Sequence, residues 1–162
     1  MSAVHSFSES NGIGEVVSDG ISNVNFGNAD EANIVPASHP VNAGEASFEK
    51  YIRCLFSGVW TEISNMKFWK SAGSYVTGEA IKAAANVAFA TPSQTVNADS
   101  DIPTALGSAL AILSAEGAST IEYGVSGVSG YTKYIRMQAQ TTSSSPAGNV
   151  NQKTFTFQYD EI

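Results

Sequence analysis

The chain has 162 residues, of which 43% are hydrophobic and only 14% are charged. That length suits one domain with its own core, and the composition is unlike that of a disordered acidic chain. The formal net charge of -7 argues against a nucleic-acid partner, because phosphate contacts are built from clustered Lys and Arg and the eight such residues here are scattered.

Neither a secretory signal nor a membrane span is predicted. The first residues, MSAVHSFSESNGIGEVV, lack a basic region followed by an apolar one. The most apolar window, AIKAAANVAFA, is interrupted by Lys82 and Asn86 and is far shorter than the roughly 18 apolar residues of a spanning helix. We therefore expect synthesis in a cytoplasm and no membrane partner.

Residues 1–20 are rich in Ser, Gly and Asn, and their apolar residues are too sparse for the periodicity of a strand or a helix. We predict an extended N-terminal arm, which either is disordered or is ordered along a neighbouring subunit. The spaced apolar residues favour the second alternative. Four of them are candidate subunit contacts: Phe7, Ile13, Val16 and Val17.

From residue 21 onward, short segments of β-branched and aromatic residues alternate with clusters of Gly, Pro, Asn and Ser. This pattern predicts one all-β domain over residues 21–162, a sandwich or a barrel. The expected strands are 21–26, 50–60, 62–70, 110–113, 134–142 and 154–159. The strand at 62–70 follows closely enough to pair with 50–60, and a long hairpin loop, SSSPAGNVNQK, is expected to join the last two strands.

The segment at 79–90 is ambiguous. Its alanines favour a helix, whereas Val87, Phe89 and the final Thr-Pro favour a strand. We predict a strand, because every neighbouring segment is β.

The tetrapeptide KYIR occurs twice, at 50–53 and at 133–136. Alternation places Tyr and Arg on one face of each strand and Ile on the other. The repeat therefore predicts two strands built alike, neighbours in one sheet, that display four side chains together. If that face is exposed, those side chains are candidate subunit contacts, because Tyr and Arg are favoured at interfaces; otherwise they only fill the strands. They are Tyr51, Arg53, Tyr134 and Arg136.

No catalytic signature is present. His5 and His39 have no Cys or carboxylate at ligand spacing. The run GVSGVSG at 124–130 lacks the two flanking glycines of a nucleophile elbow. Cys54 lies in an apolar run, which favours a small buried side chain over a reactive thiol. We predict no catalytic residue, no cofactor and no metal.

Three minor alternatives remain open. The acidic segment 97–101 is a solvated turn or, less simply, a calcium site. Trp60, Trp69, Tyr75 and Tyr131 would form a carbohydrate platform if their rings share one face. An enzyme would require convergence of at least two members of one set: His5, His39, Asp99, Asp101 and Glu116.

The pattern KYIRCLFSGVWTEISNMKFWKS, then FATPSQT, then YTKYIRMQAQTTSSSPAGNVNQKTFTFQYDEI, resembles small β-sandwich proteins encoded among the virion genes of tailed bacteriophages. The resemblance covers residues 20–162, and its motifs are structural. It implies an immunoglobulin-like or jelly-roll-like antiparallel β-sandwich that serves in the particle as a capsid decoration or cement protein, or as a neck, tail or baseplate component. It carries no site residues.

The leading hypothesis is a non-catalytic structural protein of the virion, made in the bacterial host cytoplasm and most simply a capsid decoration protein. Its expected partners are the major capsid protein or tail and neck proteins, and further copies of itself in a homo-oligomer. The acidic balance suits the outside of a particle better than contact with packaged DNA. The alternative is a carbohydrate- or host-surface-binding module of a tail fibre or baseplate.

Overall fold

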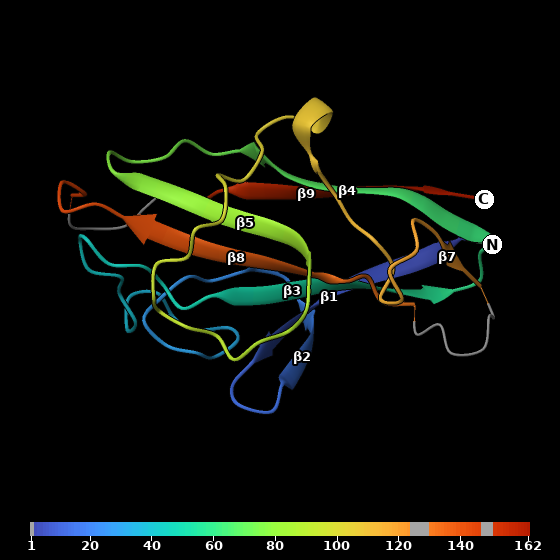
Figure 1. Ribbon diagram of the computed structural model, residues 1–162, viewed down its shortest axis with the longest axis horizontal. Coiled ribbons are helices and arrows are strands. Elements are labelled where there is room, and N and C mark those ends of the chain that lie inside the picture. The colour runs from blue at the N-terminus through green and yellow to red at the C-terminus, as the bar shows by residue number, and fades with distance from the viewer. Residues whose placement is uncertain (1, 124–129, 147–150) are drawn as a thin grey trace.

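The computed structural model describes residues 2–123, 130–146 and 151–162. Within them, two sheets of antiparallel strands pack face to face, so the predicted β-sandwich is confirmed (Figure 1). The elements in chain order are β1 (Ala3–Asn11), β2 (Val16–Ile21), β3 (Lys50–Gly58), β4 (Glu62–Ala72), β5 (Glu79–Val87), a short 3-10 turn η1 (Leu106–Ser108), β6 (Leu110–Ala111), β7 (Ile121–Glu122), β8 (Tyr134–Thr141) and β9 (Thr154–Glu161).

The larger sheet has the strand order β2-β1-β3-β8-β5, so β3 and β8 occupy its interior. In the smaller sheet, β4 pairs with β9 along one side and with the short β6 and β7 along the other. Figure 1 shows this arrangement, with β4 and β9 along the upper margin and the strands of the larger sheet following one another down to β2. The two chain ends lie close together, since the Ala3 amide donates a hydrogen bond of 2.8 Å to the Glu161 carboxylate.

Residues 3–21 form a β-hairpin within the larger sheet, where an extended arm was expected. β1 pairs with β3 along eight residue positions and with β2 on its other side. The turn is made by Gly-Ile-Gly-Glu at 12–15, in which Gly12 and Gly14 adopt φ angles of 72° and 91° that favour glycine. The sparse apolar pattern was misleading because β1 buries polar residues, among them Ser8 and Ser10.

Two of the expected strand pairings are wrong, although the strands themselves exist. β3 and β4 lie in different sheets, and so do β8 and β9. β8 and β9 therefore do not form the expected hairpin, and residues 147–150 of the segment between them lie outside the described part of the chain. Alternation of side chains determines which face of a strand is apolar, but it does not specify which strand lies beside it.

Of the three remaining predicted strands, one is confirmed, one is shorter than expected and one is mostly absent from the described structure. Residues 79–87 are a strand, β5, because Ile81 and Ala83 turn into the core while Lys82 turns outward. The strand expected at 110–113 shortens to the two residues of β6. Residues 22–26 pair with no strand in the described structure, although Val24 and Phe26 still pack against the core.

The core lies between the sheets and contains the Ile of each KYIR copy. Ile52 and Ile135 are directly opposite one another on β3 and β8. Each is at most 2% exposed, and Cys54 and Met137 extend the same apolar face. The face predicted to be apolar in both strands is therefore the one that meets the smaller sheet.

Replacement of Ile135 tests this central packing. Ile135→Ala should lower the free energy of unfolding in urea by about 2–5 kcal/mol, because a fully buried side chain is lost and leaves a cavity. Val4→Ala removes an apolar side chain that is 62% exposed, so its effect should stay within about 0.5 kcal/mol. Similar losses in the two variants would contradict the assignment of the core.

Candidate functional site

The two KYIR segments lie side by side in the larger sheet. β3 and β8 pair in an antiparallel register in which Tyr51 is opposite Arg136 and Ile52 is opposite Ile135. The next position along brings the Arg53 guanidinium to 4.7 Å from the ring centroid of Tyr134. The prediction that the repeats are neighbours in one sheet, with their Tyr and Arg side chains together on one face, is confirmed.

That face is mostly covered by the chain itself. Tyr51 is 1% exposed and Tyr134 is 8% exposed. Phe89, from the segment that follows β5, packs edge-on against Tyr51 with ring centroids 5.2 Å apart. The two tyrosines are therefore interior residues, and they are not available as the subunit contacts that an exposed face would have provided.

Arg136 binds the loop around Asp99 and holds it over this face. Its Nε and Nη2 donate to the two carboxylate oxygens of Asp99 at 2.8 and 2.6 Å, a bidentate geometry, and Glu49 lies 3.6 Å away. Burial raises the pKa of Tyr51 above its ordinary value, and its hydrogen bond with Arg136 opposes that rise. The cluster is saturated with internal partners, so its role is to hold the loop around Asp99 against the sheet.

The two aspartates of the calcium alternative at 97–101 both have basic partners. Asp99 is bound by Arg136, and Asp101 forms an ion pair of 2.8 Å with Lys82. Residues 2–123, 130–146 and 151–162 contain no group of three or more His, Cys, Asp or Glu side chains that could hold a metal ion.

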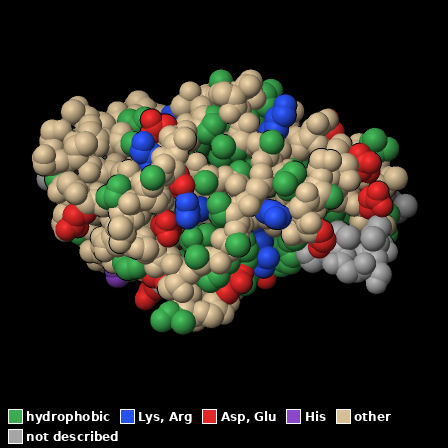
Figure 2. Space-filling view, in the orientation of Figure 1, with side chains coloured by type: hydrophobic (Ala, Val, Ile, Leu, Met, Phe, Trp, Pro, Cys, Tyr) green, Lys and Arg blue, Asp and Glu red, His purple; other side chains and the backbone are tan. Residues whose placement is uncertain are grey.

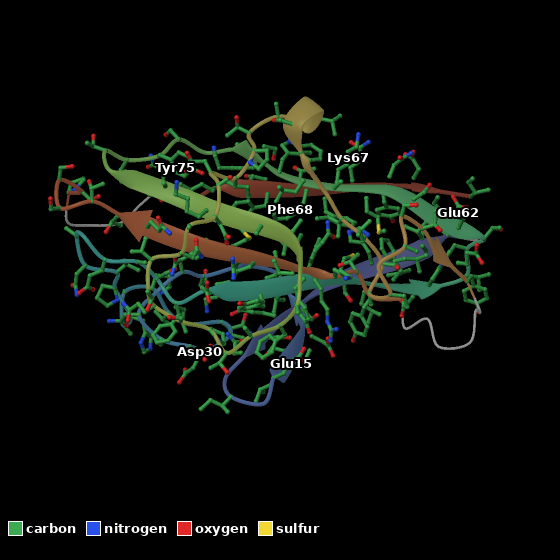
Figure 3. The ribbon with its side chains drawn as sticks, in the orientation of Figure 1. Glu15, Asp30, Glu62, Lys67, Phe68 and Tyr75 are labelled. Atoms are coloured by element: carbon green, nitrogen blue, oxygen red, sulfur yellow. The ribbon has the colours of Figure 1, made fainter. Side chains whose placement is uncertain are left out.

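Tyr134 fastens the tip of the β1–β2 hairpin. Its hydroxyl donates to the carboxylate of Glu15, and Ser10 Oγ lies 3.2 Å from the same hydroxyl. Burial, and after it the bond to Glu15, raises the pKa of Tyr134 to about 12. On the other side of the hairpin, the Gly12 amide donates to Asp30 at 3.0 Å. Figure 3 shows Glu15 and Asp30 beside the hairpin at the lower margin of the larger sheet.

A buried ion pair joins the same hairpin to β3. Lys50 Nζ lies 2.9 Å from Glu9 Oε1, and neither side chain is exposed. Lys50 also donates to the backbone carbonyl of Glu31 at 2.6 Å. We did not predict this pair from the sequence, although there was a signal: Lys50 shares the strand face of Ile52, and a buried Lys requires an acidic partner.

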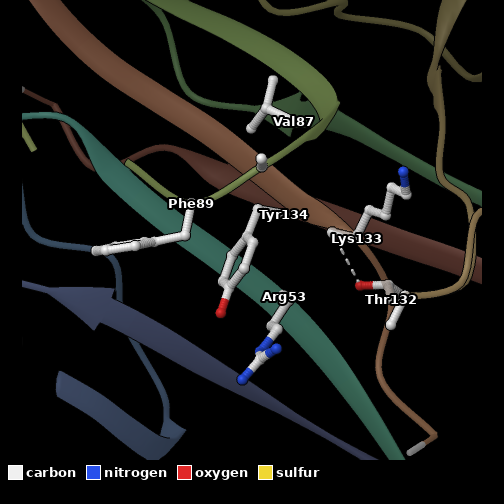
Figure 4. A pocket seen from close by; sticks show the side chains of 8 residues that line it. Arg53, Val87, Phe89, Thr132, Lys133 and Tyr134 are labelled. Atoms are coloured by element: carbon white, nitrogen blue, oxygen red, sulfur yellow. Dashed lines mark hydrogen bonds between the residues drawn. The ribbon is translucent and has the colours of Figure 1, made fainter. Parts of the chain in front are cut away.

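Arg53 lines a small pocket on the outer face of the larger sheet (Figure 4). Its guanidinium lies 4.0 Å from the ring centroid of Tyr131 as well as 4.7 Å from that of Tyr134. The pocket has a volume of about 240 Å³. Its lining residues are Arg53, Val87, Ala88, Phe89, Ala115, Thr132, Lys133 and Tyr134.

The four apolar contact candidates of the hairpin differ in their exposure to solvent. Ile13 at the turn is 91% exposed, and Val16 and Val17 on β2 are 65% and 38% exposed. Phe7 instead turns inward and packs edge-on against Phe157 of β9, with centroids 5.7 Å apart. The structure thus leaves Ile13, Val16 and Val17 exposed and assigns Phe7 to interior packing.

The four candidate carbohydrate-stacking rings do not share a platform. Trp60 donates its indole N–H to the Ile121 carbonyl at 3.1 Å and packs on Phe56 and Tyr123. Trp69 is opposite Thr156 in the smaller sheet. Tyr75 lies beside the ammonium groups of Lys70 and Lys153, and Tyr131 lies against Arg53.

The candidate acid and base residues are also separated. His5 packs on Phe7 and Tyr159. In the described structure, no hydrogen bond or ion pair joins two members of the set His5, His39, Asp99, Asp101 and Glu116. Residues 124–129 of the GVSGVSG run lie outside the described residues.

These observations define an antiparallel β-sandwich protein whose larger sheet carries a loop-covered polar face, a small arginine pocket and an exposed apolar hairpin. No family model, curated protein or solved structure matches the chain. Among the described residues, no helix has the length and apolar character that crossing a bilayer requires.

The buried ion pair predicts a large asymmetry between two lysine variants. Lys50→Met should cost about 3–5 kcal/mol of unfolding free energy, because it leaves the Glu9 carboxylate buried without its cation. Lys82→Met breaks a pair whose side chains are 25% and 73% exposed, so less than about 1 kcal/mol should be lost. Glu9→Gln combined with Lys50→Met should recover part of the loss in urea denaturation; no recovery would show that the charge is not the cause.

Cys54 should be inert in the folded protein. Its thiol is buried, and burial raises its pKa to about 12, so almost no thiolate exists at neutral pH. A disulfide reagent such as DTNB should modify the native protein at pH 8 only as fast as the chain unfolds. The chain in urea is the positive control, and equal rates in the two conditions would overturn the prediction.

Proposed function

We propose that the chain is a non-catalytic structural protein of a phage particle, and within the particle a capsid decoration protein. One observation carries the proposal: the β1–β2 hairpin presents exposed apolar side chains on a fixed edge of the sandwich. The apolar residues are Ile13, Val16 and Val17.

The hairpin is held in place and is not a loose loop. Glu15 is bound by the Tyr134 hydroxyl and the Gly12 amide is bound to Asp30. The Lys50–Glu9 ion pair fixes β1 below it. Because these contacts orient the turn before any partner arrives, binding through Ile13 would cost little ordering of the backbone.

The hairpin also ends the larger sheet in an open edge. The opposite edge, β5, is covered by backbone bonds from Ala83 to Ser100 and from Ile102 to Ile81. β2 pairs only with β1 among the described strands, and its first two residues are exposed valines. Open edges with apolar residues are avoided in free proteins because they recruit other chains, so this edge supports an assembly role.

The virion placement rests on the resemblance of residues 20–162 to β-sandwich proteins of tailed phages. A capsid lattice displays many equivalent sites, and many weak contacts of this kind add avidity. The net charge of -7 favours an outer position over contact with packaged DNA.

Copy number in purified particles tests the proposal. Particles assembled with the unaltered chain should contain it at a number comparable with that of the major capsid protein by quantitative mass spectrometry. Ile13→Asp with Val16→Asp should lower its occupancy at least about tenfold, because charges replace the apolar contacts. Val35→Asp is the matched control, since Val35 is 61% exposed and lies outside the hairpin. Absence of the unaltered chain from the particles, or equal occupancy for the hairpin variant, would overturn the proposal.

A further inference from the structure

We propose that Arg53 anchors a binding pocket for a small, ring-sized organic carboxylate. The inference begins with the charges of the larger sheet and its loops. Four of the basic residues form ion pairs within the described structure: Lys50, Lys82, Arg136 and Lys153.

Arg53 is different, because no carboxylate lies within ion-pairing distance of it in the described structure. Residues 1, 124–129 and 147–150, which the structure does not describe, include no Asp or Glu. Lys133 likewise has no ion pair there, and it lines the same pocket. The chain has 15 acidic residues against eight basic ones, so a basic side chain without an acidic partner in a pocket is unusual here, and Arg53 supplies the positive charge of this one. In the view of Figure 2, acidic and basic side chains are scattered over the surface, with no large area of one charge.

Stacking determines how Arg53 presents its donors. The rings of Tyr131 and Tyr134 lie 4.0 and 4.7 Å from the guanidinium carbon, so they support the planar group and limit its rotation. Its N–H groups lie in the plane of the guanidinium, which leaves its edge as the binding direction. Nε is buried with no hydrogen-bond acceptor among the described residues, so the donors of this side chain are incompletely satisfied by the protein.

The rest of the pocket suits an apolar body. Val87, Ala88 and Phe89 form one wall, and the volume of about 240 Å³ is below the roughly 300–1,000 Å³ of pockets for drug-sized ligands. Figure 4 shows Arg53 and Tyr134 extending to the same side, while the amino group of Lys133 points away from them. One anionic group at Arg53, attached to a single ring that packs on Phe89, fits this arrangement.

A monoanion fits better than a phosphate dianion. A guanidinium matches a carboxylate in bidentate geometry with one unit of charge on each side. The carboxylate of Glu15 is bonded to the hydroxyl of Tyr134, a lining residue, and would repel a dianion more strongly than a monoanion. The ligand class is therefore a carboxylate on one ring, either aromatic or sugar.

Titration of the full chain with two probes tests the inference. Sodium benzoate and sodium glucuronate, added at constant ionic strength, separate the aromatic from the sugar source. Either probe should produce saturable amide NMR shifts at Val87, Lys133 and Tyr134, whereas benzamide and glucose, which lack the carboxylate, should not. Inorganic phosphate should bind more weakly than the better carboxylate.

Substitutions test whether the probe binds at Arg53. Arg53→Gln should weaken binding of the better probe at least about tenfold. Arg53→Lys keeps the positive charge but cannot donate two parallel hydrogen bonds to a carboxylate, so its affinity should be intermediate. Lys67→Gln is the matched charge control, because Lys67 lies on β4 in the other sheet and also has no ion pair among the described residues (Figure 3). Amide spectra away from the pocket verify that each variant is folded. No saturable shift with either probe, or equal affinity for Arg53→Gln and the unaltered chain, would overturn the proposal.

Discussion

The antiparallel pairing of β3 with β8 is the constraint on which the rest of the structure depends. Its register sets Ile52 against Ile135 in the core and Tyr51 against Arg136 on the opposite face. A shift of one residue in either strand would reverse its faces, so that charged and aromatic side chains would enter the core. The apolar contacts between the sheets therefore also determine where the polar side chains of the outer face lie. The loop at Asp99, the hairpin tip and the arginine pocket are all built on that face.

Most polar side chains that the fold buries have a partner, and Arg53 Nε, at the proposed pocket, is one of five buried side-chain atoms without a hydrogen bond in the described structure. Lys50 has Glu9, and Arg136 has Asp99. Such pairs contribute little net stability compared with apolar packing, but losing one member is costly, so they make one arrangement of loops much more favourable than others. Arg53 has aromatic neighbours and no acidic partner in the described structure. Apolar side chains show a similar contrast: those of the core are buried between the sheets, whereas the valines at the start of β2 are exposed.

The strands with clear alternation could be predicted from the sequence, and β3, β4, β8 and β9 all lie where the pattern placed them. β5 was predicted as a strand despite its alanines, and Ile81 and Ala83 show why, since small and branched side chains fill the narrow space between sheets. The β1–β2 hairpin was missed because β1 buries Ser and Glu side chains, whose partners come from distant segments, and β2 has no buried residue. The pairing of consecutive strands was wrong for a related reason: which strands become neighbours depends on how both sheets close around one core.

The sequence by itself determined the two faces of each KYIR strand, because side chains alternate along extended backbone whatever surrounds it. It also determined the all-β class through its short branched and aromatic segments. Only the tertiary structure decided what lies on the Tyr and Arg face. Covering segments distant in sequence made Tyr51 an interior residue, gave Arg136 a carboxylate and left Arg53 lining a pocket. Burial and charge pairing are properties of the assembled neighbours, so identical tetrapeptides acquire different chemistry at their two positions.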